Sequence, residues 1–146
     1  MAYQHILVPV DGSETSYQAI GKAAALAAAF NSQITVVQVL TLDPYIAAEY
    51  ITAQQTNELI ERARQSIIKA LENAQEKFAE FGLKAETKLL EGQSISDEIT
   101  KAAKSSGVDL IVIGSHGRTG LKKLFLGSVA QSILGESEIP VLIVRK

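Results

Sequence analysis

Short apolar runs alternate along the chain with longer segments whose apolar residues recur every three or four positions. The runs are typical of buried strands, and the spaced patterns are typical of helices that pack one face on a core. The predicted strands are His5–Val10, Ile34–Leu40, Ala85–Leu90, Leu110–Ile113 and Val141–Val144. The predicted helices are Thr15–Phe30, Thr56–Phe81, a segment from an N-cap at Ser94 to about Lys104, and Ser128–Gly135. Each helix therefore falls between two strands.

Strict alternation of strands and helices predicts an α/β fold with one open, parallel, five-stranded sheet and helices on both faces. Neighbouring parallel strands need a crossover connection, which these helices supply. Strands buried on both faces read as continuous aliphatic runs, so we place His5–Val10 and Leu110–Ile113 at the centre. Ala85–Leu90 alternates polar and apolar residues, which is typical of an edge. The expected strand order is 3-2-1-4-5, within a single domain of residues 1–146.

The last predicted strand, Val141–Val144, is as apolar as the central strands although the expected order puts it at an edge. Apolar edges promote aggregation, and natural proteins usually protect them. We therefore expect a homodimer in which a second copy of the chain pairs along residues 140–145. The alternative is an edge whose faces are simply buried by helices.

Composition excludes several classes of protein. Of the 146 residues, 47% are hydrophobic and 21% are charged, which is typical of a globular domain. There is no cysteine, and His5 and His116 are the two histidines, so disulfides, thiol catalysis and a protein-built metal site are not expected. The formal charge of −2 gives no basic surface for nucleic acid or an anionic membrane, and no apolar run approaches the ~20 residues that span a bilayer. The first residues lack a cationic region followed by an apolar one, so we expect a cytoplasmic protein.

Two unusual segments meet at one place in the expected sheet. Ligands of open parallel sheets bind beyond the carboxyl ends of the strands, where the strand order reverses. In the order 3-2-1-4-5 this switch point lies between the first and fourth strands. Residues 9–13 (Pro-Val-Asp-Gly-Ser) follow the first strand, and the glycine-rich residues 114–120 follow the fourth.

The glycine-rich segment has the chemistry of a phosphate cradle. Glycine lets the backbone approach an anion, and the amides and dipole of a helix N-terminus attract negative charge. We expect Ser128 to be the N-cap of the helix that follows. The glycines are Gly114, Gly117, Gly120 and Gly127, and the nearby cations are Arg118, Lys122 and Lys123. The alternative is a turn-rich loop that leads into an ordinarily capped helix.

Asp11 is the acidic residue at the switch point, where it can accept hydrogen bonds from a ribose or an adenine amino group. The alternative is a turn aspartate that caps the helix beginning near Ser13–Thr15. The P-loop, the G-x-G-x-x-G fingerprint after the first strand and the G-x-S-x-G nucleophile elbow are absent from the sequence. A triad of His116, Asp11 and a serine (Ser115 or Ser128) is disfavoured, because no motif fixes its geometry.

Residues 41–55 are long for a connection between a strand and a helix. Long loops at this end of a sheet are often lids or binding segments. The alternative is an extended helix start or a segment that merely fills the crossover.

The motifs at both ends of the chain resemble those of the universal stress protein family, over essentially the whole length. The likeness is carried by HILVPVDGSETS at residues 5–16, and by IVIGSHGRTGLKKLFLGSVAQSIL at residues 111–134 followed by IPVLIV at residues 139–144. The sharpest match is that family's nucleotide signature, G-x2-G-x9-G-[ST], here Gly114, Gly117 and Gly127-Ser128. The resemblance implies the ATP-binding branch of the family, a Rossmann-like, adenine nucleotide alpha hydrolase-like fold, and a homodimer through the last strand.

The resemblance also implies roles for individual residues. Expected at the phosphates are the amides of Gly117, Gly127, Ser128 and Val129 and the Ser128 hydroxyl, with His116 and Arg118 in the same nucleotide-binding segment. Expected at the ribose are Asp11 and Gly114, and expected around the adenine are Pro9, Val10 and Val39. Ala130 stands where some nucleotide-holding relatives have a hydroxyl residue, which implies a weaker grip on the γ-phosphate and leaves ATP, ADP and AMP open.

The leading hypothesis is a homodimeric regulatory protein of stress adaptation that binds an adenine nucleotide. We expect slow hydrolysis at most and assign no catalytic residue, because no general base or arginine finger is evident for in-line attack. Mg²⁺ or Mn²⁺ would bind through the phosphates. One alternative is a nucleotidyl-transferring enzyme that uses His116. The other is a dimer with a vestigial pocket that binds an unknown client protein.

Overall fold

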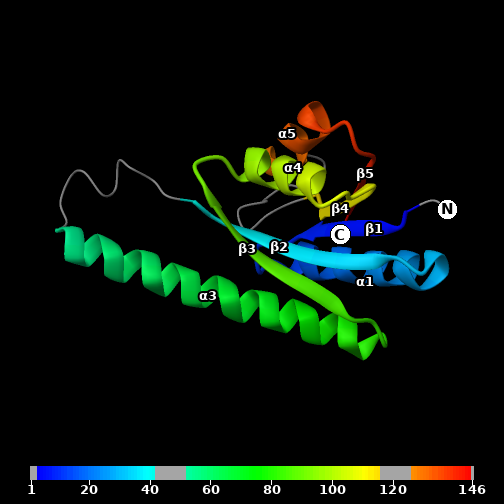
Figure 1. Cartoon of the computed structure of the whole chain (residues 1–146), viewed down its shortest axis with the longest axis horizontal. Helices are drawn as coiled ribbons and strands as arrows, with labels where there is room; N and C mark the ends of the chain where they lie inside the picture. The colour runs from blue at the N-terminus through cyan, green and yellow to red at the C-terminus, as the bar shows by residue number, and fades with distance from the viewer. Residues whose placement is uncertain (1–2, 42–51, 116–125, 146) are drawn as a thin grey trace.

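A computed structural model describes residues 3–41, 52–115 and 126–145. The strands form one parallel sheet in the order β3-β2-β1-β4-β5 (Figure 1). The strands are β1 (His5–Pro9), β2 (Gln33–Thr41), β3 (Ala85–Gly92), β4 (Leu110–Gly114) and β5 (Val141–Val144). The helices are α1 (Glu14–Phe30), α3 (Ala53–Glu80), α4 (Ile95–Ser105) and α5 (Ser128–Glu136). The predicted α/β fold and strand order are confirmed.

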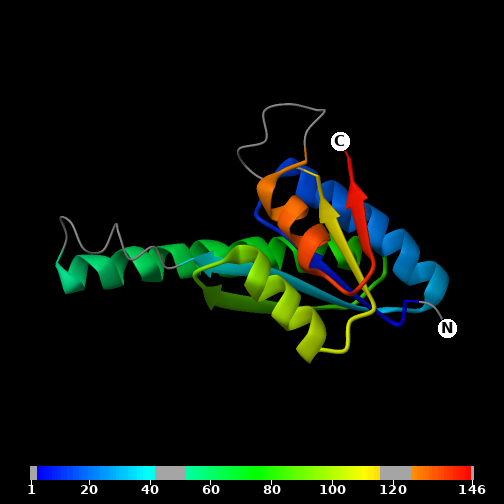
Figure 2. The ribbon, with the colours of Figure 1, turned by 90° about the horizontal axis from the view of Figure 1, so that it is seen from above.

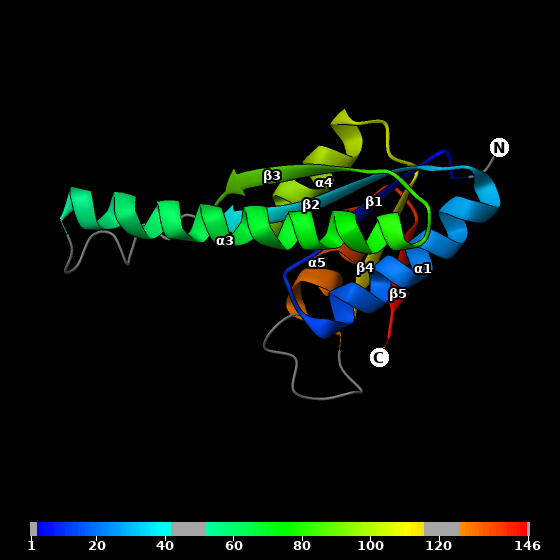
Figure 3. The ribbon, with the colours of Figure 1, turned by 90° about the horizontal axis from the view of Figure 1, so that it is seen from below.

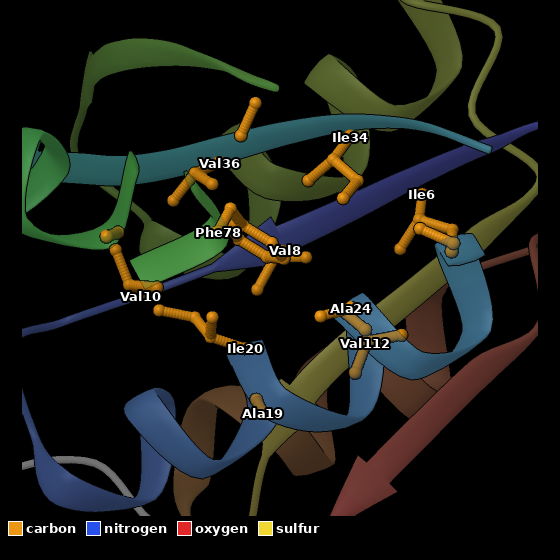
Figure 4. Packing of buried hydrophobic residues seen from close by; sticks show 14 of the residues in the cluster. Ile6, Val8, Val10, Ala19, Ile20, Ala24, Ile34, Val36, Phe78 and Val112 are labelled. Atoms are coloured by element: carbon orange, nitrogen blue, oxygen red, sulfur yellow. The ribbon is translucent and has the colours of Figure 1, made fainter. Parts of the chain in front are cut away.

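Helices cover both faces of the sheet, α1 and α3 on one face and α4 and α5 on the other (Figures 1 and 3). A hydrophobic cluster lies on each face of the sheet. Successive side chains of a strand point to opposite faces, so each central strand contributes residues to both clusters. Ile6 and Val8 of β1, and Val10 just after it, pack on the side of α1 and α3 (Figure 4), whereas Leu7 of β1 packs on the side of α4 and α5. Both faces of β1 and β4 are therefore buried, which explains their continuous aliphatic sequences.

Helix α3 begins earlier than the predicted Thr56. Its N-cap is Thr52, whose hydroxyl accepts the Gln55 amide at 3.1 Å while the Gln55 side chain accepts the Thr52 amide at 2.9 Å. This reciprocal pair is a capping box, and the T-x-x-Q pattern that encodes it is visible in the sequence. The extended helix start is therefore correct for residues 53–55, and residues 42–51 lie outside the described part of the chain. The N-terminal part of α3 runs past the ends of β2 and β3 (Figures 1 and 3).

The two edge strands differ in the way that the sequence predicts. Along β3 exposed residues alternate with more buried ones, and the polar Glu86 and Lys88 face solvent. Strand β5 is apolar throughout, yet the Leu142 side chain is 38% exposed. Within the described residues, β5 pairs with β4 on its inner side. Pairing of its outer side with a second copy stays a prediction.

Among the described helices, none combines the length and the apolar character that a membrane crossing requires.

Candidate functional site

The carboxyl ends of β1 and β4 separate at the predicted switch point. These strands pair at Ile6–Leu110 and Leu7–Ile111, although β1 continues to Pro9 and β4 to Gly114. By contrast, β1 stays paired with β2 to its last residue, and beyond it the Val10 amide donates to the Val37 carbonyl at 2.8 Å. The end of β1 therefore follows β2 and leaves β4, which opens the sheet where ligands bind in this class of fold.

Asp11 organises the turn from β1 into α1. Its Oδ1 accepts the Ser13 amide at 2.8 Å, across Gly12, whose φ of 82° is a conformation that favours glycine. Ser13, not Asp11, is the N-cap of α1, and its hydroxyl accepts the Ser16 amide at 3.2 Å. Asp11 is thus a turn residue, as the alternative interpretation predicts, but it is not the cap of α1 that the same interpretation predicts.

Gly114 lies against the first turn of α1. A Cβ atom at this position would come within 2.8 Å of Thr15 Cγ2 and 3.0 Å of the Thr15 carbonyl carbon and oxygen. Thr15 is itself buried. The sequence predicts that glycine here admits an anion, but the structure gives a different reason, because the α1 backbone fills the space that a side chain would need.

The N-terminus of α5 corrects one prediction. Gly127, not Ser128, is the N-cap, with φ −63° and ψ 158°, and no side chain of the described residues caps the helix. Ser128 is the first helical residue and is exposed. The first amides of a helix have no partner within the helix, so those of Ser128 and Val129 are placed to bind an anion.

The Gly127 amide is already used within the protein. It donates to the Ser115 carbonyl at 2.6 Å, and the Ser115 amide donates to the Val144 carbonyl of β5 at 2.8 Å. Ser115 is 1% exposed. Sequence reasoning missed Thr15 as a residue that shapes the site and considered Ser115 only as a possible triad serine. No sequence pattern indicates the hydrogen bonds that join Ser115 to Gly127 and Val144, because backbone atoms make them.

The residues expected around adenine lie on different faces of the sheet. Val10 belongs to the cluster beneath α1 and α3 (Figure 4), whereas Val39 belongs to the cluster beneath α4 and α5. Both side chains are at least nine-tenths buried, and Pro9 is buried as well. Val10 can therefore contribute to a site on the other face only through its backbone.

Three predicted site residues, His116, Gly117 and Arg118, lie outside the described part of the chain, as do Gly120, Lys122 and Lys123. The triad hypothesis depends on His116 and therefore also concerns residues outside the described part of the chain. In residues 3–41, 52–115 and 126–145, no group of three or more His, Cys, Asp or Glu side chains is placed to hold a metal ion.

The other histidine, His5, lies at the opposite, amino end of the sheet. Its Nδ1 is 3.1 Å from the Ser106 carbonyl and its Nε2 is 2.7 Å from the Thr35 hydroxyl. A carbonyl only accepts, so Nδ1 carries the proton, and in the neutral ring Nε2 accepts from Thr35. This histidine links β1, β2 and the end of α4, and it is remote from the switch point.

The far end of α5 carries an electrostatic contact with α4. Desolvation, the nearby charge of Asp97 and a hydrogen bond shared with Asp97 raise the pKa of Glu136 above its ordinary 4.5, whereas a hydrogen bond from Ser96 opposes the shift. The Ser96 hydroxyl lies 3.4 Å from Glu136 Oε1. The proximity of Asp97 therefore makes ionisation of Glu136 less favourable where α4 and α5 meet than it is in an unfolded chain.

Comparison with known proteins gives a consistent result over the full length. The profile of the universal stress protein family matches residues 2–145. Universal stress protein YxiE of Bacillus subtilis is 36% identical over 148 aligned positions, which cover 98% of this chain and 99% of that protein.

Solved structures agree with the sequence comparison. The structure of protein MJ0577 of Methanocaldococcus jannaschii superposes with a TM-score of 0.86 at 31% identity and covers 100% of this chain and 98% of that one. A universal stress protein in complex with cAMP superposes with a TM-score of 0.74 at 25% identity and covers 99% of this chain and 98% of that one. The fold is thus shared with both over essentially the whole chain.

Proposed function

Because the chain belongs to the universal stress protein family, we propose that it is a regulatory protein that binds an adenine nucleotide, with ATP as the leading candidate. The observation that carries the proposal is the position of the nucleotide signature. Its first glycine, Gly114, ends β4 at the switch point, and its last two residues, Gly127 and Ser128, begin a helix that no described side chain caps. A universal stress protein of the same fold has been solved with cAMP, which supports an adenine nucleotide as the class of ligand.

In this proposal the phosphates lie at the N-terminus of α5. The amides of Ser128 and Val129 and the Ser128 hydroxyl donate to phosphate oxygens, and the helix dipole favours their negative charge. The Gly127 amide holds the helix start in place through Ser115. Gly117, His116 and Arg118 complete the phosphate site by family resemblance.

The nucleoside occupies the opening between β1 and β4. Asp11 accepts hydrogen bonds from the ribose hydroxyls while its Oδ1 keeps the Ser13 amide, and Gly114 forms the adjacent wall. Pro9, Val10 and Val39 surround the adenine, Val10 through its backbone. The metal ion, Mg²⁺ or Mn²⁺, is held by the phosphates, because the protein groups proposed around the phosphates are mainly hydrogen-bond donors and do not coordinate a cation. Hydrolysis is slow at most.

The proposal includes a homodimer through β5, in the cytoplasm. The apolar edge with Leu142 exposed supports the dimer, because an unprotected apolar edge is otherwise an aggregation site. Sedimentation of the purified protein tests the assembly, and cell fractionation tests the location.

The first experiment identifies the ligand. Purified protein is denatured, and any released nucleotide is quantified by chromatography and mass spectrometry, followed by calorimetric titration of ATP with Mg²⁺. We expect one adenine nucleotide per chain or saturable binding of ATP. An empty extract together with no heat at millimolar ATP would leave the partner-binding dimer as the function. Turnover of ~1–10³ per second would instead indicate an enzyme.

Asp11 provides the matched variants for this titration. Asp11→Asn keeps an oxygen for the Ser13 amide but loses the charge, and Asp11→Ala loses both. Removal of a hydrogen bond to a charged group costs about 1.5–3 kcal/mol, so we expect Asp11→Ala to weaken ATP roughly 10- to 150-fold. Asp11→Asn should fall between Asp11→Ala and the parent protein, with the fold unchanged by circular dichroism. Equal affinity in all three proteins would remove Asp11 from the site.

A further inference from the structure

Ser115 joins the start of α5 to the edge strand β5. Its amide donates to the carbonyl of Val144, the last residue of β5, and its carbonyl accepts the amide of Gly127, the N-cap of α5. The two hydrogen bonds measure 2.8 and 2.6 Å, and Ser115 is 1% exposed. One buried residue thus bonds both to the strand at the sheet edge and to the helix start where the phosphates are proposed to bind.

Side chains connect the same two places. Val129, in the first turn of α5, packs into the hydrophobic cluster that also takes Val141 and Ile143 of β5. Ile133 of α5 is fully buried in this cluster, so side chains of α5 and β5 share one hydrophobic cluster. Figure 2 shows α5 beside the adjacent strands β4 and β5. A shift of β5 therefore moves or loosens the first turn of α5.

Strand β5 is the element of this connection that an external contact can change. In the described residues it is bonded on one side only, by β4, and it has four residues with Leu142 exposed. A strand that gains a second hydrogen-bonded neighbour loses freedom to shift, and the Val144 carbonyl is then fixed more firmly.

We propose that Ser115 couples nucleotide binding to the pairing of two copies through β5, so that each event strengthens the other. This proposal rests on the proposed function, since it takes the adenine nucleotide at α5 and the β5 pairing as its two events. Coupling of this kind is reciprocal: the factor by which ATP tightens the dimer equals the factor by which the dimer tightens ATP. Coupling free energies in proteins typically correspond to factors of about 5 to 150.

The experiment measures both sides of this linkage on the full chain. Analytical ultracentrifugation gives the dimer dissociation constant with and without saturating ATP and Mg²⁺. Calorimetry gives the ATP affinity of the parent protein and of Leu142→Glu, which puts two carboxylates into the paired edge. We expect ATP to tighten the dimer, and Leu142→Glu to be monomeric and to bind ATP more weakly by the same factor.

Leu59→Glu is the matched control. Leu59 is 48% exposed and belongs to the N-terminal part of α3, a part that lies away from β5 (Figures 1 and 3). The same substitution there should therefore change neither the dimer constant nor the ATP affinity. Amide hydrogen exchange then tests the route. The Ser115 and Gly127 amides should exchange faster in Leu142→Glu than in Leu59→Glu, and more slowly in either protein once ATP is bound.

The outcomes distinguish failure of the coupling from failure of the proposed nucleotide-binding function. If ATP binds with equal affinity to the dimer and to Leu142→Glu, the coupling is wrong and the nucleotide site stands. If no protein binds ATP, the proposed function fails and the coupling fails with it. A parent protein that stays monomeric with and without ATP also overturns the coupling. If amide exchange in Leu142→Glu rises at Ser115 but not at Gly127, Ser115 does not transmit the change from β5 to the start of α5.

Discussion

Thr15 and Gly114, ninety-nine positions apart in the sequence, are in contact where α1 begins and β4 ends. A Cβ atom on Gly114 would approach Thr15 Cγ2 to 2.8 Å and the Thr15 backbone to 3.0 Å, closer than side chains normally come. The first turn of α1 therefore rests directly on the end of β4. This contact fixes the start of α1, and so the Asp11 turn before it, relative to Gly114.

Gly114→Ala should destabilise the protein through this contact. The methyl group meets backbone atoms that cannot rotate away, so α1 has to shift, and overpacking of this kind costs about 1–3 kcal/mol. The free energy of unfolding in urea measures the effect. Adding Thr15→Ser removes the Cγ2 methyl but leaves the backbone atoms, so the double variant should recover part of the loss. If Gly114→Ala lowers the free energy of unfolding equally in the parent protein and in Thr15→Ser, the contact is contradicted.

Alanine substitutions at Gly21 and Gly82 should change the stability of the protein in opposite directions. Neither would bring a Cβ within 4 Å of another atom, so packing does not distinguish them. Gly21 is inside α1, where alanine is favoured over glycine by about 0.5–1 kcal/mol. Gly82 has φ 76°, a conformation that costs an alanine about 1–2 kcal/mol. Urea denaturation should show Gly21→Ala more stable and Gly82→Ala less stable than the parent, and two changes of the same sign would refute this.

The strand order was predictable because burial leaves a direct mark on strand sequences. Leu110–Gly114 is buried at every position and reads as an aliphatic run, while in Ala85–Gly92 exposed residues alternate with more buried ones. The capping box of Thr52 and Gln55 is equally local, and its pattern is visible in the sequence although the predicted helix began after it. Local signals of this kind are complete within a few residues.

The details of the site depend on distant contacts and on backbone atoms. Nothing near Gly114 in the sequence indicates that Thr15 lies against it. Cap preferences favour serine, which led to Ser128 as the predicted N-cap, but the N-cap is Gly127, one residue earlier, whose amide bonds to the Ser115 carbonyl. Tertiary hydrogen bonds of the main chain leave no residue-type signature.

Ser128 permits a test that separates an amide from a hydroxyl. Proline is well tolerated at the first helical position, and Gly127 has ψ 158°, which suits a residue before proline. Ser128→Ala removes the hydroxyl and keeps the amide, whereas Ser128→Pro removes both. ATP should bind more weakly to Ser128→Pro than to Ser128→Ala, roughly 10- to 150-fold if the amide contacts a charged phosphate oxygen. Equal affinities by calorimetry would place the phosphates elsewhere.

The contact between α4 and α5 should make stability depend on pH. Desolvation and the proximity of Asp97 raise the pKa of Glu136 above 4.5 in the folded protein. A carboxyl group with a raised pKa binds its proton more tightly when folded than when unfolded. Its contribution to stability is therefore fully present below the unfolded value and is lost as the pH rises through the folded value.

Glu136→Gln should consequently be more stable than the parent at neutral pH and should lose this advantage as the pH falls below the ordinary carboxyl range. Asp97→Asn should behave in the same way, because it removes the neighbouring charge from the same pair. Glu138→Gln is the control: its carboxylate lies 3.8 Å from Lys104 at an exposed position, where an ion pair contributes little. Thermal unfolding across a pH series measures the three differences. A Glu136→Gln advantage that persists unchanged into acid would show that the substitution acts through packing and not through the charge.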